Sequence, residues 1–195
     1  PGAHGNQTLQ EVIANSCNDA MMQIAERMGT EEFLETQTLF NLGSRTGIDL
    51  PNEGTGIMHT ADTMGPTELA CSAFGQGFTC TMIQEINAIC SVINGGYYYQ
   101  PHLVSRIEDS NGTVVREMEP TLLKQTVSSS ISEDIRSYMQ SSVESGTSHY
   151  SKVNGYSSGG KTGTAEKFPR GNGKYLVSFV GFAPVDDPAV VIYVV

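Results

Sequence analysis

The run Ser158-Gly159-Gly160-Lys161-Thr162-Gly163-Thr164 has the residue types of a strand that binds a peptide. Alternate residues of a strand point to the same face, so Lys161 and Gly163 are expected on one face and Thr162 and Thr164 on the other. Glycine at position 163 lets another backbone approach closely. An edge strand with a lysine ammonium and threonine hydroxyls beside it suits an extended peptide that ends in a carboxylate. The alternative is a Gly-rich hairpin with a solvated lysine.

A second polar cluster, Ser16-Cys17-Asn18-Asp19, falls between two predicted helices at residues 7–14 and 20–28. Asn18 or Asp19 suits the N-cap of the second helix. Capping alone therefore accounts for this cluster, unless the fold brings it to the Lys161 stretch.

Helical patterns occupy most of the first two thirds of the chain. Thr30 is expected to cap a helix that ends before Gly43, and residues 67–73 predict a short helical turn. The strongest helix is predicted over residues 81–94, where apolar side chains recur at helical spacing. Ser132 is expected to cap a further helix that runs to about residue 143.

Strand patterns dominate the last third. Asn111-Gly112 predicts a hairpin between residues 102–108 and 113–117. Residues 176–182 and 189–195 predict two antiparallel strands, and the second is so apolar that we expect it to be buried on both faces. The fold class is therefore α+β: helices packed against an antiparallel sheet, with a small β insert near residues 97–126.

Composition excludes several function classes. The 195 residues carry a net charge of −10 and no basic stripe, which excludes nucleic acid as the expected partner. No apolar run reaches membrane-spanning length, and no signal peptide is visible. The sequence Phe74-Gly75-Gln76-Gly77 predicts a tight bend and lacks the third glycine of a dinucleotide loop, so no cofactor is expected.

The four cysteines, Cys17, Cys71, Cys80 and Cys90, form no C-x-x-C pair and have no histidine at zinc-like spacing. We therefore expect no metal site. A disulfide between Cys71 and Cys80 stays open as an alternative to free thiols.

Taken together, Ser16-Cys17-Asn18 and Lys161-Thr162-Gly163 resemble the S-x-N and K-T-G motifs of penicillin-binding proteins and β-lactamases. Other segments resemble the monofunctional class B D,D-transpeptidases, in particular the division and sporulation branch of Gram-positive bacteria. They follow the family's order along nearly the whole chain: Thr46-Gly47-Ile48-Asp49-Leu50-Pro51, Phe74-Gly75-Gln76-Gly77, Asn94-Gly95-Gly96 with Pro101-His102-Leu103-Val104, and Ser178-Phe179-Val180-Gly181-Phe182-Ala183-Pro184. The resemblance implies a transpeptidase fold that cross-links peptidoglycan.

The resemblance also implies a role for each motif residue. Ser16 would relay a proton to the leaving amine, and Asn18 would bind the substrate amide and a general-base lysine. Lys161, Thr162 and Thr164 would hold the terminal carboxylate of a stem peptide ending in D-Ala-D-Ala, along the strand that Gly163 opens. The Thr164 N–H would be one of two oxyanion donors. β-Lactams would acylate the same serine nucleophile as the stem peptide.

In one respect the sequence departs from this family. The family places its S-x-x-K nucleophile upstream of S-x-N, whereas the only S-x-x-K here is Ser158-Gly159-Gly160-Lys161, on the approach to a strand. We therefore interpret residues 1–195 as a partial transpeptidase domain, truncated at both ends and inactive by itself. Its apolar strand 189–195 would then be an open edge that favours self-association.

Three alternatives remain at this point. A serine β-lactamase or penicillin-sensing protein shares both motifs, although the long segment between Asn18 and Lys161 is typical of transpeptidases. The second alternative is a pseudo-transpeptidase that serves as a non-catalytic scaffold. The third is a secreted α+β domain that is unrelated to this family. For the transpeptidase, the expected location is the extracytoplasmic face of the bacterial membrane, with an anchor outside residues 1–195.

Overall fold

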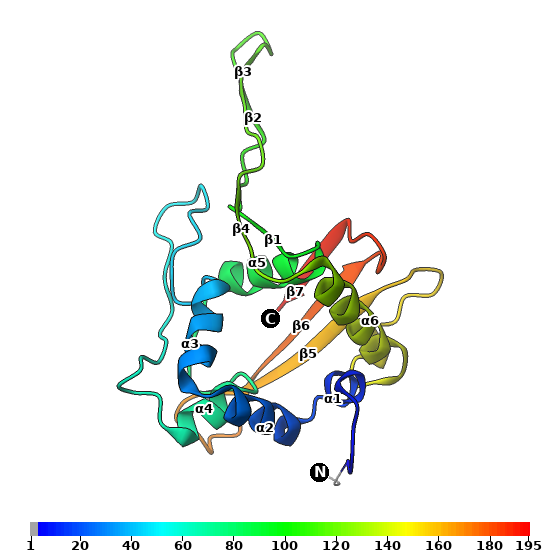
Figure 1. The fold of residues 1–195 in the computed structure, drawn as a ribbon. Coiled ribbons are helices and arrows are strands. Elements are labelled where there is room, and N and C mark those ends of the chain that lie inside the picture. Colours follow the sequence, from blue (N-terminus) through cyan, green and yellow to red (C-terminus); the bar gives the residue numbers. More distant parts are fainter. Residues whose placement is uncertain (1–3) are drawn as a thin grey trace.

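A computed structural model of the chain describes residues 4–195 (Figure 1). The helices are α1 Leu9–Asn15, α2 Asn18–Met28, α3 Thr30–Leu39, α4 Pro66–Ser72, α5 Met82–Ile93 and α6 Ser129–Ser145, and a 3-10 turn covers His149–Ser151. The main sheet consists of β5 Gly159–Glu166, β6 Tyr175–Ala183 and β7 Val190–Val194, antiparallel and in that order. Two smaller antiparallel pairs join β1 Tyr97–Tyr99 to β4 Leu122–Gln125, and β2 Arg106–Glu108 to β3 Val114–Glu117. The predicted α+β class is confirmed.

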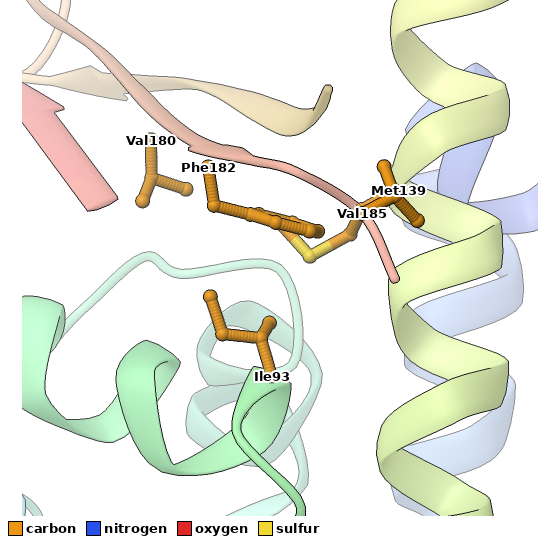
Figure 2. Close-up of a cluster of buried hydrophobic side chains, with 5 residues drawn as sticks. All are labelled: Ile93, Met139, Val180, Phe182 and Val185. Atoms are coloured by element: carbon orange, nitrogen blue, oxygen red, sulfur yellow. The ribbon is translucent and has the colours of Figure 1, made fainter. Parts of the chain in front are cut away.

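One face of the sheet packs on helices α5 and α6. Val180 and Phe182 of β6 lie against Ile93 of α5 and Met139 of α6, and Val185 completes this buried cluster (Figure 2). Lys161 of β5 pairs with Val180 in the sheet register. Because paired residues of neighbouring strands share a face, Lys161 points toward the helix-covered side of the sheet.

Helix α5 forms where its apolar periodicity predicts it. Thr81 is the N-cap: its hydroxyl accepts a hydrogen bond from the Gln84 N–H, and the Gln84 side chain accepts one from the Thr81 N–H. This reciprocal capping box satisfies two N–H groups at the start of the helix that have no partner within it. Gln84 also donates to Ser44 O and Thr55 O, so the same side chain ties α5 to the long loop after α3.

Three capping predictions are wrong. The N-cap of α3 is Gly29, and Thr30 is the first residue of that helix. The N-cap of α2 is Cys17, and Asn18 lies in the first helical turn without capping it. The N-cap of α6 is Ser128, whose hydroxyl accepts from the Ile131 N–H. Ser132 is fully buried, and its hydroxyl accepts from the Gly95 N–H at 3.0 Å, which ties α6 to the end of α5. Several serines stand in a row before α6, and local sequence alone does not distinguish the cap among them.

The prediction that residues 189–195 are buried on both faces is wrong for this chain. Val191 and Tyr193 pack on the core cluster, whereas Val190, Ile192 and Val194 are 56–57% exposed. Among residues 4–195, no strand pairs with the outer edge of β7. The open-edge expectation for this strand therefore describes its geometry better than full burial does.

The strands of the small β region form an arm that projects from the body of the molecule (Figure 1). Gly112 has a φ of +81°, as the Asn111-Gly112 turn requires, and Asp109 accepts hydrogen bonds from the Asn111 and Thr113 N–H groups. At the root of the arm, the Asp49 carboxylate accepts from the Leu103 and Val104 N–H groups at 2.7 and 2.9 Å. These bonds lower the pKa of Asp49.

All four cysteines are free, so the disulfide left open between Cys71 and Cys80 does not form. None of the helices described is long and apolar enough to cross a membrane.

Candidate active site

A cavity of about 830 Å³ opens between the sheet and the surrounding helices. All the residues predicted to form the site line it, and they come from the C-terminal end of α1, from α2 and from β5. The lining includes Ser16, Asn18, Lys161, Thr162, Gly163 and Thr164. The structure therefore brings together two clusters that lie about 145 residues apart in the sequence.

Lys161 and Ser16 form the central contact of the site. The Lys161 ammonium donates to Ser16 Oγ at 2.8 Å and to its neighbour's carbonyl, Thr162 O, at 2.8 Å. Burial lowers the pKa of Lys161, because the charged form loses hydration. The ion pairs found among residues 4–195, Arg106–Glu108 and Lys152–Glu144, do not include it. A half-buried cation held by uncharged oxygens is suited to bind an anion.

Ser16 is placed by the end of helix α1. It is the C-cap residue, with a φ of +52° in the left-handed region, and its N–H donates to Ile13 O. A non-glycine residue costs about 1 kcal/mol or more in this region, so the surrounding contacts must hold it there. The turn directs the Ser16 hydroxyl toward β5, and the chain enters α2 two residues later. Asn18 therefore lines the same cavity from the first turn of α2.

The outer edge of β5 forms one wall of the site. Among the described residues, β5 has a single strand partner, β6, as an edge strand does. Thr162 Oγ1 donates to Thr147 Oγ1 at 3.4 Å, and Thr164 is exposed. At Gly163 an added Cβ would lie 2.6 Å from Ser178 Oγ. The space left by this glycine is therefore used by the neighbouring strand.

Sequence reasoning missed several side chains that line the cavity. Gln76 donates to Thr164 O at 3.3 Å, and Thr147 lies beside Thr162. The bend at Gly75 and Gly77, whose φ angles are +83° and +94°, was predicted. The contact between Gln76 in this bend and Thr164 was not predicted. The two residues lie 88 positions apart, and no local sequence pattern indicates a contact at that separation.

Glu85 and Tyr193, two further ionisable side chains, also line the cavity, and Cys80 contacts Glu85. The Cys80 thiol donates to Glu85 Oε2 at 3.4 Å, and burial together with this carboxylate raises the pKa of Cys80 to about 12. Burial also raises the pKa of Tyr193, which lines the cavity with Glu85. No group of three or more histidine, cysteine or carboxylate side chains that could hold a metal occurs in residues 4–195.

Ser158, the serine of the only S-x-x-K string, does not line this cavity. It lines a separate pocket with Phe179 and Ile192, residues of β6 and β7. This placement separates Ser158 from Ser16 and Asn18.

The fold and this site define a penicillin-binding transpeptidase domain. The family "Penicillin binding protein transpeptidase domain" matches residues 2–195, and the chain belongs to this family. Among curated relatives, it is 43% identical to stage V sporulation protein D of Bacillus subtilis, over 99% of this chain and 30% of that protein. It is 31% identical to penicillin-binding protein PbpB of Mycolicibacterium smegmatis, over 95% of this chain and 30% of that protein. The chain thus spans about 30% of the length of these relatives.

Solved structures agree with this assignment. The D,D-transpeptidase domain of a peptidoglycan glycosyltransferase from Eggerthella lenta superposes with a TM-score of 0.88 at 28% identity, over 98% of this chain and 49% of that one. Penicillin-binding protein 3 from Mycobacterium tuberculosis, solved in complex with ampicillin, superposes with a TM-score of 0.85 at 28% identity, over 95% of this chain and 44% of that one. The predicted family and fold are confirmed.

Proposed function

We propose that residues 1–195 form the substrate-recognition part of a peptidoglycan D,D-transpeptidase. The observation that carries this proposal is the hydrogen bond between Lys161 and Ser16 at 2.8 Å, in a cavity that Asn18 also lines. A half-buried ammonium beside a hydroxyl, an amide and an open strand edge suits a peptide with a terminal carboxylate. The proposed substrate class is therefore a stem peptide ending in D-Ala-D-Ala, and β-lactams bind the same site.

The reaction that this site would serve consists of two acyl transfers. A serine oxygen attacks the carbonyl carbon of the penultimate D-Ala, the amide C–N bond breaks, and the leaving D-Ala amine takes a proton. An amine of a neighbouring stem peptide then attacks the acyl-serine ester and releases the serine. In this scheme Ser16 relays the proton, Asn18 binds the substrate amide, and Lys161 with Thr162 holds the carboxylate.

The Thr164 N–H supplies one oxyanion donor in this scheme. A donor of this kind contributes roughly 3–4 kcal/mol to stabilisation of the transition state. Gly163 lets β5 and β6 lie close together beside this donor, since Ser178 Oγ of β6 occupies the space that a Cβ would need.

The attacking serine and its base lysine, in this proposal, lie outside residues 1–195. Two observations support this. Ser158 lines a pocket separate from the Lys161 cavity, and the chain spans about 30% of its curated relatives. The 195-residue chain alone would then be inactive, and its parent would act at the extracytoplasmic face of the bacterial membrane.

A fluorescent penicillin tests the proposal, with intact mass spectrometry of the 195-residue chain and of the full-length product of the gene. We expect an adduct on the full-length protein and none on residues 1–195. An adduct on Ser158 or Ser16 would overturn the placement of the nucleophile. A full-length product that takes no label would be a pseudo-transpeptidase, and rapid turnover of a chromogenic cephalosporin would identify a β-lactamase.

A further inference from the structure

The outer edge of β5 has acceptor groups that are already occupied. Thr162 and Thr164 are two residues apart, so their carbonyl groups leave the strand on the same side. Thr162 O accepts from the Lys161 ammonium, and Thr164 O accepts from Gln76 Nε2. Both donors are side chains, and they stand where the N–H groups of an added strand would bind.

Gln76 is held in this place by the end of helix α4. The Gln76 N–H donates to Cys71 O at 3.0 Å, and the preceding Gly75 N–H donates to Ser72 O. Gly75 and Gly77 both have positive φ angles, which place the bend that carries Gln76 across the cavity from β5. The side chain is half-buried and lines the cavity beside the exposed Thr164.

A bound peptide would compete with Gln76 for one acceptor. If Lys161 and Thr162 hold the terminal carboxylate, a peptide antiparallel to β5 extends toward Thr164. Two residues of a strand span about 6.7 Å, which brings the N–H of the penultimate residue opposite Thr164 O. The Thr164 carbonyl oxygen has two lone pairs, and the Gln76 carboxamide donates to one of them. The peptide N–H must therefore either displace Gln76 or bind beside it on the second lone pair.

We propose that Gln76 is a specificity-determining residue that covers the Thr164 carbonyl until a ligand N–H replaces it. This inference rests on the proposed function and names a determinant of the ligand within the same site. In the wild-type protein, a ligand without that N–H does not displace Gln76, and Thr164 O keeps its hydrogen bond to the Gln76 side chain. Without Gln76, the same ligand leaves Thr164 O unpaired at the strand edge. Gln76 also protects the edge from pairing with unrelated strands.

Two ligands separate this role from a purely structural one. The first is a diacetylated lysyl-D-Ala-D-Ala peptide, and the second is the matched ester in which D-lactate replaces the penultimate D-Ala, so that an oxygen stands in place of the N–H. The measurement is the ratio of their dissociation constants, ester over amide, on the full-length product of the gene. In the Gln76→Ala variant we expect this ratio to rise roughly three- to tenfold, the value of one net hydrogen bond.

The control is Gln100→Ala, which removes another side-chain amide that donates to a backbone carbonyl, Gly47 O at 2.7 Å, away from the cavity lining. It should leave the ratio unchanged. A loss of structure would weaken both ligands equally, so a ratio within twofold of wild type in Gln76→Ala overturns the proposal. If Gln76→Ala does not fold, Gln76→Met keeps the length of the side chain and carries the same expectation.

A ligand-free measurement separates this inference from the proposed function. Loss of the Gln76 donor in Gln76→Met should shift the carbonyl carbon resonance of Thr164, and Gln100→Ala should not. A Thr164 resonance that does not move overturns the inference even if both ligands bind. A wild-type protein that binds neither ligand, with the Thr164 resonance shifted in Gln76→Met, overturns the proposed function and limits Gln76 to protection of the strand edge.

Discussion

At the scale of single residues, the charge of Lys161 is the main determinant of the proposed site. Lys161 is half-buried beside a hydroxyl and a carbonyl and takes part in neither of the ion pairs found in residues 4–195. An anionic ligand would supply the charge that these partners lack. Replacement of the ammonium by an apolar side chain therefore removes a charge-assisted contact and preserves most of the packing.

Lys161→Met should reduce the second-order rate constant of penicillin acylation of the full-length gene product by roughly 10- to 100-fold, the value of a hydrogen bond to a charged group. Lys167→Met, on the exposed turn after β5, is the matched control and should stay within twofold of wild type. A similar loss in both variants would show that the effect is not specific to the site.

The pH dependence of the same rate follows from the lowered pKa of Lys161. Only the ammonium attracts a carboxylate, so acylation should fall as pH rises through a pKa below the ordinary value of 10.5. Lys161→Arg should move this alkaline limb to higher pH, because guanidinium keeps its proton. An identical alkaline limb in wild type and Lys161→Arg would assign the titration to another group.

Cys80 gives a second prediction at this scale. Burial and the Glu85 carboxylate raise the pKa of its thiol to about 12, so the reactive thiolate is scarce at pH 8.5. In the native protein, iodoacetamide should label Cys80 at least ~10-fold more slowly than in denaturant, as read by peptide mass spectrometry. Cys71, which lines the cavity, is the internal comparison. Equal labelling of Cys80 in both states would contradict its burial.

The raised pKa of Cys80 also makes the free energy of unfolding depend on pH. The folded state keeps the Cys80 proton above the ordinary pKa of 9.0, whereas the unfolded state loses it. The stabilisation linked to this group is therefore complete below pH 9 and is lost as pH rises toward 12.

At the scale of elements, the capping box of α5 carries a prediction about stability. Thr81→Ala removes the hydroxyl that accepts from the Gln84 N–H, and it should cost about 1 kcal/mol in the free energy of unfolding. Urea denaturation of the variant measures this cost. Thr121→Ala, at an exposed position before β4, should change stability by less than half as much.

The glycines at the start of strand β5 are required by close packing. A Cβ at Gly160 would lie 2.6 Å from the Phe179 ring and 2.8 Å from Val180 O, so the neighbouring strand would have to move. Gly160→Ala should therefore destabilise the fold by roughly 1–3 kcal/mol, the usual cost of overpacking. Gly54→Ala is the control, because its nearest contact would be 3.7 Å. Equal midpoints in urea for the two variants would contradict this packing.

The elements that could be predicted from sequence are those with a local signal. The apolar periodicity indicates α5, and Asn111-Gly112 indicates the hairpin, because each signal depends on residues that are near in the sequence. The caps of α2 and α6 were wrong, because several polar residues compete there and tertiary contacts decide which side chain caps and which is buried.

The site shows the same division between local and distant information. The two motif clusters could be paired from their resemblance to one family, and the structure places Ser16 and Lys161 in contact. The hydrogen bond from Gln76 to Thr164 O could not be predicted, because a contact across the cavity produces no periodic pattern in the sequence. For β7, an apolar run indicated burial but could not tell which of its two faces a helix covers.

At the scale of the whole molecule, β7 combines an open edge with an apolar face. Val190, Ile192 and Val194 are exposed on the face away from α5, and no strand among residues 4–195 pairs with the outer edge. Unprotected edges of this kind pair with strands of other molecules. We therefore expect the 195-residue chain to associate with itself through this strand as its concentration rises.

Sedimentation velocity over a range of concentrations measures this association. Ile192→Lys places a charge at the centre of the exposed face and should shift the distribution toward monomer, because a lysine on an edge strand opposes strand pairing. Val115→Lys is the matched control: it introduces the same charge at an exposed apolar position of the projecting arm. If Val115→Lys abolishes association and Ile192→Lys does not, the arm is the interface. A wild-type chain that stays monomeric at every concentration would show that the open edge of β7 does not pair.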